Sequence, residues 1–214
     1  SEAPDAADVR ERLLDAAAAL ASEGRLDSAG IRAIADRAGV SSGMIAYYFG
    51  DRRGLHEAML ERAFARVSAE VEAELTRRDD EDDLLDRLLH IHATGLAADP
   101  WIAGFIAREI LAGDGPARER FVAMLADGPL RSVRLAIAAA IERGALRADL
   151  DPTMVLLTVA SASAFPYLLG PLLCEPLGYR LDASFRDRLI AHNQTLVAQG
   201  LRAPAPPPSE EDSA

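Results

Sequence analysis

The chain has 214 residues, of which 50% are hydrophobic, 27% charged and 5% aromatic, and its formal net charge at pH 7 is −11. This length is sufficient for one or two domains with hydrophobic cores, and a lone cysteine, Cys174, excludes an internal disulfide scaffold and favours a reducing compartment. The acidic N-terminus is unlike a secretory leader, and prolines and a glycine interrupt the most apolar stretch (154–174), so we expect a cytoplasmic protein that does not enter a membrane.

The first third of the sequence has the spacing of four helices. Apolar residues recur every three to four positions over about 9–21 and again over about 52–77, where Asp51 is a suitable N-cap. Two short helices, about 30–37 and 42–48, lie between them and are joined by a tight turn. We assign residues 1–8 to a flexible N-terminus.

The remaining sequence also has helical periodicity, with breaks rich in proline, glycine and aspartate. The acidic run 79–83 is interpreted as a solvated helix start, because it lacks the glycine and the spacing of a calcium loop. Because no alternating strand pattern is found, the predicted fold is all-α, with a small N-terminal unit, a larger C-terminal bundle and about nine to ten helices. The further helices are predicted at about 83–98, 100–112, 116–127, 129–144, 153–169 and 184–200.

The two short helices meet the steric demands of a helix-turn-helix motif over about residues 30–49. Ala35 supplies the small residue needed where the helices cross, and Gly39 accepts the positive φ of the turn. Val40 and Ile45 are apolar anchors for the second helix. This arrangement predicts that the second helix reads DNA.

The outward side of this second helix is the candidate DNA-contacting surface. With Ile45 facing inward, Gly43 permits close approach, while Met44 and Ala46 offer apolar contact to thymine methyl groups in the major groove. Residues 28–56 carry four arginines against two aspartates, a local charge of +2 in an acidic chain. The predicted contacts are made by Arg32, Ser41, Ser42, Gly43, Met44, Ala46, Tyr47, Tyr48 and Arg52.

Within this set, the tyrosines and arginines are predicted to bind phosphates, and the two serines to bind phosphate or cap the helix. Two alternatives remain open at this point. Tyr47 and Tyr48 could pack at a helix junction, and Ser41 could serve only as an N-cap.

Residues 13–60 resemble the DNA-binding domain of the TetR family of bacterial transcriptional regulators. The resemblance lies in "LLDAA" of the first helix, Gly24 at its end, "IRAIADRAGVS", the aromatic "YYF" and a basic start to the fourth helix. Ser42, Ala46, Tyr48 and the position of Ala29 or Gly30 depart from residues common in the family, which implies either modest DNA affinity or an unusual base readout.

The resemblance implies a ligand-responsive regulator, most often a repressor, that binds a palindromic operator in double-stranded DNA as a homodimer. It further implies release from DNA by a small apolar or amphipathic effector. The implied organisation is a helix-turn-helix DNA-binding domain at 9–54, a ligand-binding and dimerisation domain at 55–200 and a disordered tail at 201–214. No cofactor and no metal are expected.

Two sets of residues in the C-terminal bundle follow from the same resemblance. For each, the alternative is that the side chains fill the monomer's own core. The expected effector pocket comprises His92, Trp101, Phe105, Arg108, Phe121, Met124 and Phe165. The expected dimer interface comprises Leu156, Val159, Ala160, Ser163, Leu189 and Leu196.

A helical enzyme or an adaptor without DNA binding is the alternative function. His90 and His92 are two positions apart on a helix, so they face apart and make a poor metal pair, and no catalytic signature is found. An adaptor would be expected to lose Arg32, Tyr47 and Arg52 together, whereas all three are present.

Overall fold

The computed structural model describes residues 6–26, 28–77, 84–99, 101–111 and 115–202. These residues form helices and turns, with a single isolated β-bridge between Leu146 and Arg202. No helix among them is both long and apolar enough to cross a bilayer. The helices are α1 (Ala6–Ser22), α2 (Ile31–Ala38), α3 (Gly43–Phe49), α4 (Arg52–Thr76), α5 (Leu84–Ala98), α6 (Trp101–Phe105), the π-helix η2 (Ile106–Leu111), α7 (Pro116–Asp127), α8 (Leu130–Glu142), α9 (Pro152–Leu168), α10 (Gly170–Leu173) and α11 (Ala183–Leu201).

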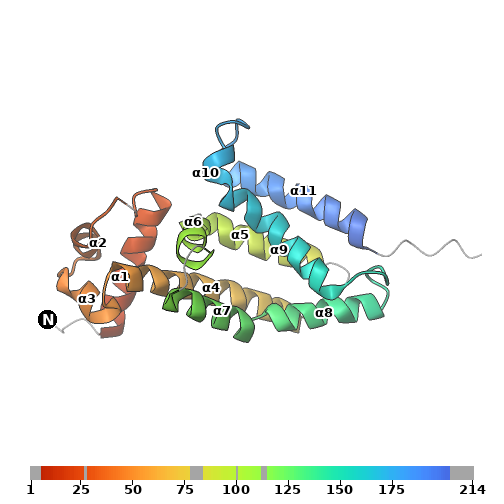
Figure 1. Ribbon diagram of the computed structural model, residues 1–214, viewed down its shortest axis with the longest axis horizontal. Coiled ribbons are helices and arrows are strands. Elements are labelled where there is room, and N and C mark those ends of the chain that lie inside the picture. The colour runs from red at the N-terminus through yellow and green to blue at the C-terminus, as the bar shows by residue number, and fades with distance from the viewer. Residues whose placement is uncertain (1–5, 27, 78–83, 100, 112–114, 203–214) are drawn as a thin grey trace, which may run out of the picture.

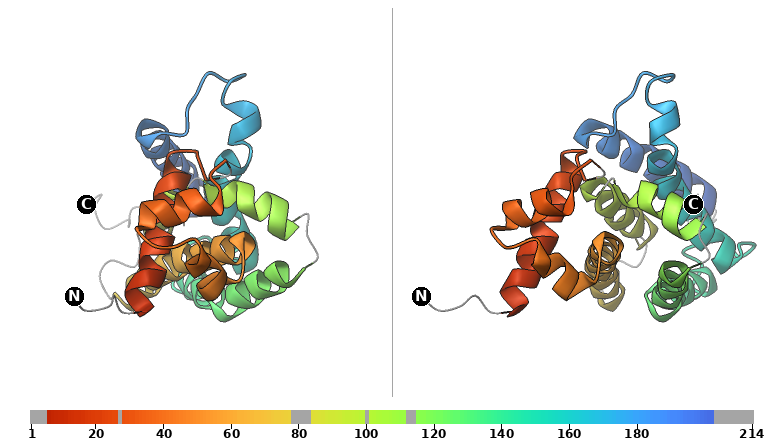
Figure 2. Two further views of the ribbon diagram at one scale, coloured as in Figure 1. Left: turned by 90° about the vertical axis from the view of Figure 1, so that its left-hand side faces the viewer. Right: turned by 60° about the vertical axis from the view of Figure 1, so that its left-hand side comes forward.

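The helices form a small unit at one end of an elongated bundle (Figure 1). Helices α1 to α3 lie together at the N-terminal end, and α4 runs from them into the bundle, where it packs against α5 and α8. Helix α5 also packs against α9 and α11. Figure 2 shows the molecule turned so that α1 to α3 come forward, with the bundle helices behind them.

Most predicted helices are present, with three differences. The helix expected at 100–112 changes from α-helix to π-helix after Phe105, and α10 was not predicted. Helix α1 begins at Ala6, inside the segment assigned to a flexible N-terminus. Arg202, assigned to the disordered tail, pairs with Asp86 at 2.7 Å, whereas residues 203–214 and the acidic run 79–83 lie outside the described residues.

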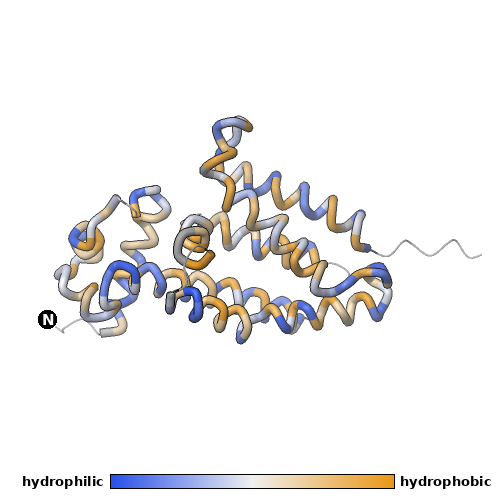
Figure 3. Tube along the Cα trace, viewed as in Figure 1, coloured by the Kyte–Doolittle hydropathy of each residue, from blue (hydrophilic) through white to orange (hydrophobic). Residues whose placement is uncertain are grey.

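Three clusters of buried side chains form the interior, and α4 contributes to all of them. Leu55 belongs to the cluster of α1, α2 and α3, Leu60 to that of α6, η2 and α7, and Val71 to that of α5, α8 and α9. Hydrophobic and hydrophilic residues alternate along α4 in Figure 3, as expected for a helix buried on one side. The N-terminal core therefore continues past residue 54, into the first turns of α4.

Two ion pairs connect α4 and α5 and show that these helices pair in antiparallel directions. Arg87 near the start of α5 pairs with Glu74 near the end of α4, and Arg66 in the middle of α4 pairs with Asp99 at 2.7 Å, just after α5. The end of α4 therefore lies beside the start of α5, and the two helices run in opposite directions.

The turn between α2 and α3 has the predicted geometry. Gly39 adopts the left-handed conformation, with φ 67° and ψ 37°, and its N–H donates to the carbonyl of Asp36 at 3.1 Å. The N–H of Val40 donates to the carbonyl of Ala35 at 3.0 Å. Ala35 and Ile45 are fully buried, so the close crossing and the anchor are both present.

An arginine of α1 completes the turn. The guanidinium Nη2 of Arg12 donates to the carbonyl of Ala38 at 2.5 Å and to that of Gly39 at 3.2 Å. A Cβ at Gly39 would lie 2.9 Å from this nitrogen. The left-handed backbone therefore favours glycine at this position, and a Cβ would in addition displace the end of the Arg12 side chain from its hydrogen bonds.

Gly39→Ala should destabilise the protein more than Gly24→Ala. Both glycines have similar φ, 67° and 68°, so alanine in the left-handed region costs roughly 1–2 kcal/mol at each. Only at Gly39 would the Cβ also disturb an arginine hydrogen bond, which adds about 1 kcal/mol, since no atom lies within 4 Å of a Cβ at Gly24. Urea denaturation of both variants tests this, and equal losses of unfolding free energy would show that the Arg12 contact contributes nothing.

Candidate nucleic-acid interface and ligand cavity

One side of α3 is open to solvent. Gly43, Ala46 and Tyr47 share this side because they are three and four positions apart, and all are exposed, Tyr47 by 77%. Ser41 and Ser42, just before the helix, are also exposed. This side, which we call the α3 face, offers a small-residue surface beside one phenol.

Two predicted contact residues flank the α3 face and are only half-buried. Met44 and Tyr48 pack against the N-terminal core. The ring of Tyr48 makes an edge-to-face contact with that of Tyr47, with centroids 4.9 Å apart. Tyr48 is therefore partly a packing residue that supports Tyr47, which was one of the alternatives left open by the sequence.

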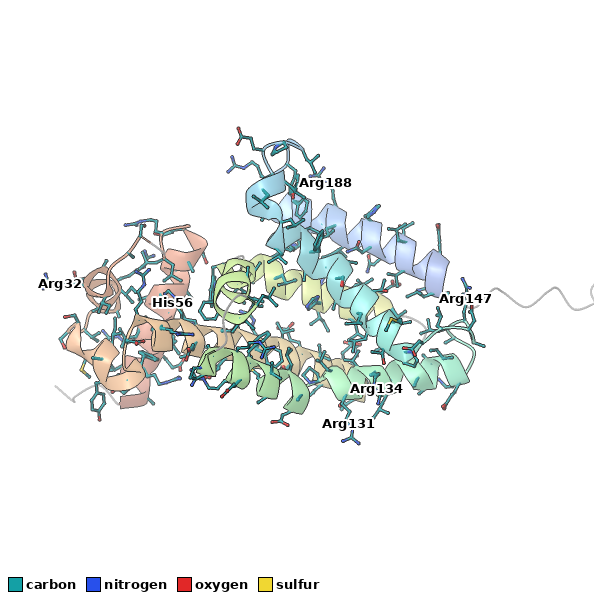
Figure 4. The ribbon with its side chains drawn as sticks, in the orientation of Figure 1. Arg32, His56, Arg131, Arg134, Arg147 and Arg188 are labelled. Carbon is teal, nitrogen blue, oxygen red and sulfur yellow. The ribbon has the colours of Figure 1, made fainter. Side chains whose placement is uncertain are left out.

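The basic residues and serines do not all lie as predicted. Arg32 is exposed on α2 and projects away from the bundle at the far end of the molecule (Figure 4). Arg52 instead donates to the carbonyl of Leu26 at 2.5 Å and so holds the connection between α1 and α2. Ser42 occupies the N-cap position of α3, but its side chain makes no capping hydrogen bond, so of the two predicted roles only phosphate binding remains open for its hydroxyl.

A cavity of about 140 Å³, the central cavity, lies among α4, α5, α7, α8 and α9. None of the described residues that line it carries a charge, and Ser68 and His92 are its polar members. The remaining lining residues are Phe64, Val67, Val71, Leu85, Leu88, Leu125, Pro129, Leu130, Val133, Ile137, Leu156, Val159 and Ala160.

The polar groups of the central cavity are buried without partners within the described structure. This holds for the Oγ of Ser68 and the Nδ1 of His92. Burial lowers the pKa of His92 from 6.5 to about 4, so its imidazole is neutral at pH 7. Unsatisfied buried polar groups are rare and often mark a place where a ligand or water binds.

A second cavity, of about 290 Å³, lies nearer the N-terminal unit, between α4 and the segment α6 to α7. Phe105, Phe121 and Met124 line it, with the Glu57–Arg120 ion pair among its polar members. The rings of Phe64, in the central cavity, and Phe121 are 6.4 Å apart, so this aromatic pair lies between the two cavities.

The predicted effector pocket is therefore divided. His92 lines the central cavity, and Phe105, Phe121 and Met124 line the second one. Trp101 lies in neither; its Nε1–H donates to Asp99 at 3.3 Å beside α1 and α4.

Phe165 is 56% exposed, so its assignment to the pocket is wrong, and the side chain of Arg108 lies outside the described residues. Ser68 was not predicted, although a serine beside the apolar stripe of α4 was a possible signal.

The predicted dimer-interface residues are also divided. Val159 and Ser163 are buried inside the monomer, the Oγ of Ser163 donating to the carbonyl of Val159 at 3.1 Å, so their assignment to an interface is wrong. Leu156 and Ala160 line the central cavity instead. Leu189 is half-buried and Leu196 is 56% exposed.

The exposed side of α9 carries a different apolar stripe. Met154, Leu157 and Phe165 are 58%, 53% and 56% exposed, and Ser161 lies between the last two. Their spacing of three or four residues, or its multiples, places them on one side of the helix. This α9 stripe is an unusually apolar surface for a helix exposed to water.

Comparison with known proteins finds relatives of the N-terminal unit. The family "Bacterial regulatory proteins, tetR family" matches residues 13–59. The regulator BetI of Serratia proteamaculans is 38% identical over 71 residues, which are 33% of this chain and 36% of BetI. The repressor KstR of Mycobacterium tuberculosis is 40% identical over 63 residues, 29% of each chain. The match thus spans about a third of the length of these relatives.

Solved structures match over nearly the whole chain. A TetR/AcrR-family regulator from Thermobifida fusca has a TM-score of 0.71 at 20% identity, over 89% of this chain and 97% of its own. FadR of Bacillus subtilis, solved in complex with stearoyl-CoA, has a TM-score of 0.66 at 17% identity, over 89% and 98%. Residues 13–59 therefore match the TetR family of bacterial regulatory proteins, and the chain as a whole shares the fold of these solved structures.

Proposed function

We propose that the chain is a transcriptional repressor that binds a palindromic operator as a homodimer and is released by a small-molecule effector. The observation that carries this proposal is the exposed α3 face on a helix-turn-helix motif whose first helix, α2, carries the exposed Arg32. Relatives named as a regulator and as a repressor support the same function.

In this proposal α3 enters the major groove. Gly43 and Ala46 allow its backbone to approach the bases closely, and the Ala46 methyl contacts thymine methyl groups. Tyr47, Arg32 and the hydroxyls of the two serines bind phosphates and set the orientation. Because the α3 face has few hydrogen-bond donors, base selection depends largely on shape and apolar contact, with the half-buried Met44 at its edge.

A homodimer follows from the limited reach of one recognition helix. A single short helix contacts only a few base pairs, so specific affinity requires two of them on neighbouring half-sites. The α9 stripe, with Leu196 of α11, is the surface proposed to pair with its copy in a second chain. Burial of these apolar side chains against one another would supply the driving force.

Release by an effector is proposed to act through α4. This helix lines both cavities and also packs in the N-terminal core, so a ligand that changes its position also moves α3. A ligand acts in this way only if it binds the DNA-bound and free conformations with different affinity. The stearoyl-CoA complex of the FadR neighbour supports a small-molecule effector.

Arg32→Ala and Tyr47→Phe should weaken binding to all duplex sequences. Loss of one phosphate contact at Arg32 should reduce the slope of log affinity against log salt by about 1, and loss of the Tyr47 hydroxyl should lower affinity roughly fivefold. Fluorescence anisotropy with a labelled duplex over a salt series measures both. Arg134→Ala is the matched control, because Arg134 is exposed on α8, far from Arg32 (Figure 4). An Arg134→Ala effect as large as that of Arg32→Ala would contradict the proposed surface.

Leu157→Asp should convert the dimer to a monomer and lower operator affinity by at least about tenfold, because a charge would be buried in an apolar interface. Leu135→Asp is the matched control, since Leu157 and Leu135 are 53% and 51% exposed and Leu135 lies on α8. Sedimentation velocity gives the assembly state of each variant. A Leu157→Asp protein that remains dimeric would exclude the α9 stripe as the interface.

A further inference from the structure

We propose that the central cavity binds a small, uncharged, mainly apolar molecule that carries one hydroxyl or carbonyl oxygen, held by Ser68 and His92. This inference rests on the proposed function only for the effect of the ligand on DNA, because binding can be measured on the protein alone.

Ser68 and His92 are brought together by the antiparallel pairing of α4 and α5. Val67 of α4 lies against Gly95 of α5, where a Cβ would be only 2.6 Å from the Cγ2 of Val67. Ser68 is the residue after Val67 on α4. His92 lies three residues, about one helical turn, before Gly95 on α5. They are therefore nearly level on facing helices, and both line the central cavity.

Both side chains have a buried polar atom without a hydrogen-bond partner, and an oxygen atom of a ligand could bond to each of them. The Oγ of Ser68 and the Nδ1 of His92 are buried, with no partner within the described structure. A serine hydroxyl can donate or accept, and a neutral imidazole nitrogen does one or the other according to its tautomer. A hydroxyl or carbonyl oxygen between them would satisfy groups that are otherwise left unpaired at a free-energy cost.

The electrostatics of the central cavity exclude charged ligands. Its described lining carries no arginine, aspartate or glutamate, and the burial that lowers the pKa of His92 to about 4 leaves the imidazole uncharged at pH 7. A carboxylate or an ammonium group placed here would lose its hydration without gaining a counter-charge. An uncharged polar group loses far less.

The volume of the central cavity sets the size of the ligand. At about 140 Å³ it is close to the apolar cavity of about 150 Å³ that binds benzene in another protein. A single ring with one oxygen substituent therefore fits without displacing the aromatic pair of Phe64 and Phe121.

The test compares phenol, toluene and benzoate as probes of the full chain without DNA, with dissociation constants from ligand-observed NMR titrations at pH 7. All three probes contain one benzene ring. Phenol adds a neutral hydroxyl, toluene has no oxygen, and benzoate carries a negative charge. Phenol should bind roughly tenfold more tightly than toluene, the equivalent of one additional net hydrogen bond, and benzoate more weakly than both. Equal affinity for phenol and toluene, or tightest binding of benzoate, would overturn the proposal.

Variants locate the binding site. Ser68→Ala and His92→Phe should each remove most of the preference for phenol and leave toluene binding within about twofold, whereas Ser132→Ala, an exposed serine on α8, should change neither. Ala160→Leu, which fills the central cavity, should weaken both probes together. A preference for phenol that survives both Ser68→Ala and His92→Phe, or binding unaffected by Ala160→Leu, would place the site elsewhere; circular dichroism confirms that each variant is folded.

A parallel DNA titration separates this proposal from the proposed function. Phenol binding with the expected dependence on Ser68, but without change in DNA affinity, would support the ligand class and contradict effector release. Intact DNA recognition without selective phenol binding would overturn the ligand class and leave the regulator function standing.

Discussion

The whole structure depends on the packing of α4, a single continuous helix of 25 residues, against three separate clusters of buried side chains. At about 1.5 Å per residue it extends nearly 40 Å. Its first turns are fixed by Leu55 and Met59 in the core that supports α3, and its second half lines the central cavity. A packed helix is stiff along its axis, so a displacement at the cavity reaches the recognition unit as a tilt or shift.

Much of the architecture could be predicted because local physical rules determine it. Apolar spacing predicts the long helices. The sequence also predicts Asp51 as the cap of α4, where it accepts a hydrogen bond from the Gly54 N–H at 2.8 Å, and Gly39 as the turn residue. The prediction of secondary structure was wrong where a helix departs from regular α-helical geometry. The π-helix η2 spans only six residues and follows α6 directly, and so short a segment is too brief for its apolar spacing to separate it from a continuing α-helix.

The candidate site was less predictable, because function at each position depends on the three-dimensional neighbourhood. Arg52 has the position of a phosphate-binding residue, but the carbonyl of Leu26 lies within its reach and binds it. Phe165 was assigned to the pocket for its aromatic ring, yet the rotation of α9 turns it to solvent. Arg12 acquires its role from a hydrogen bond to a residue 26 positions away, and Ser68 from a cavity between five helices. The spacing of apolar residues in the sequence reveals neither.

Selection of binding sites from a random duplex library by the full chain tests whether a dimer of this protein reads DNA through α3. The account predicts enrichment of an inverted repeat whose half-site centres are about one helical turn apart, because two copies of the α3 face read neighbouring major grooves. It also predicts A·T pairs within each half-site, where thymine methyl groups meet Ala46. Absence of enrichment, or enrichment of a sequence without two-fold symmetry, would contradict a dimeric regulator that reads DNA through α3.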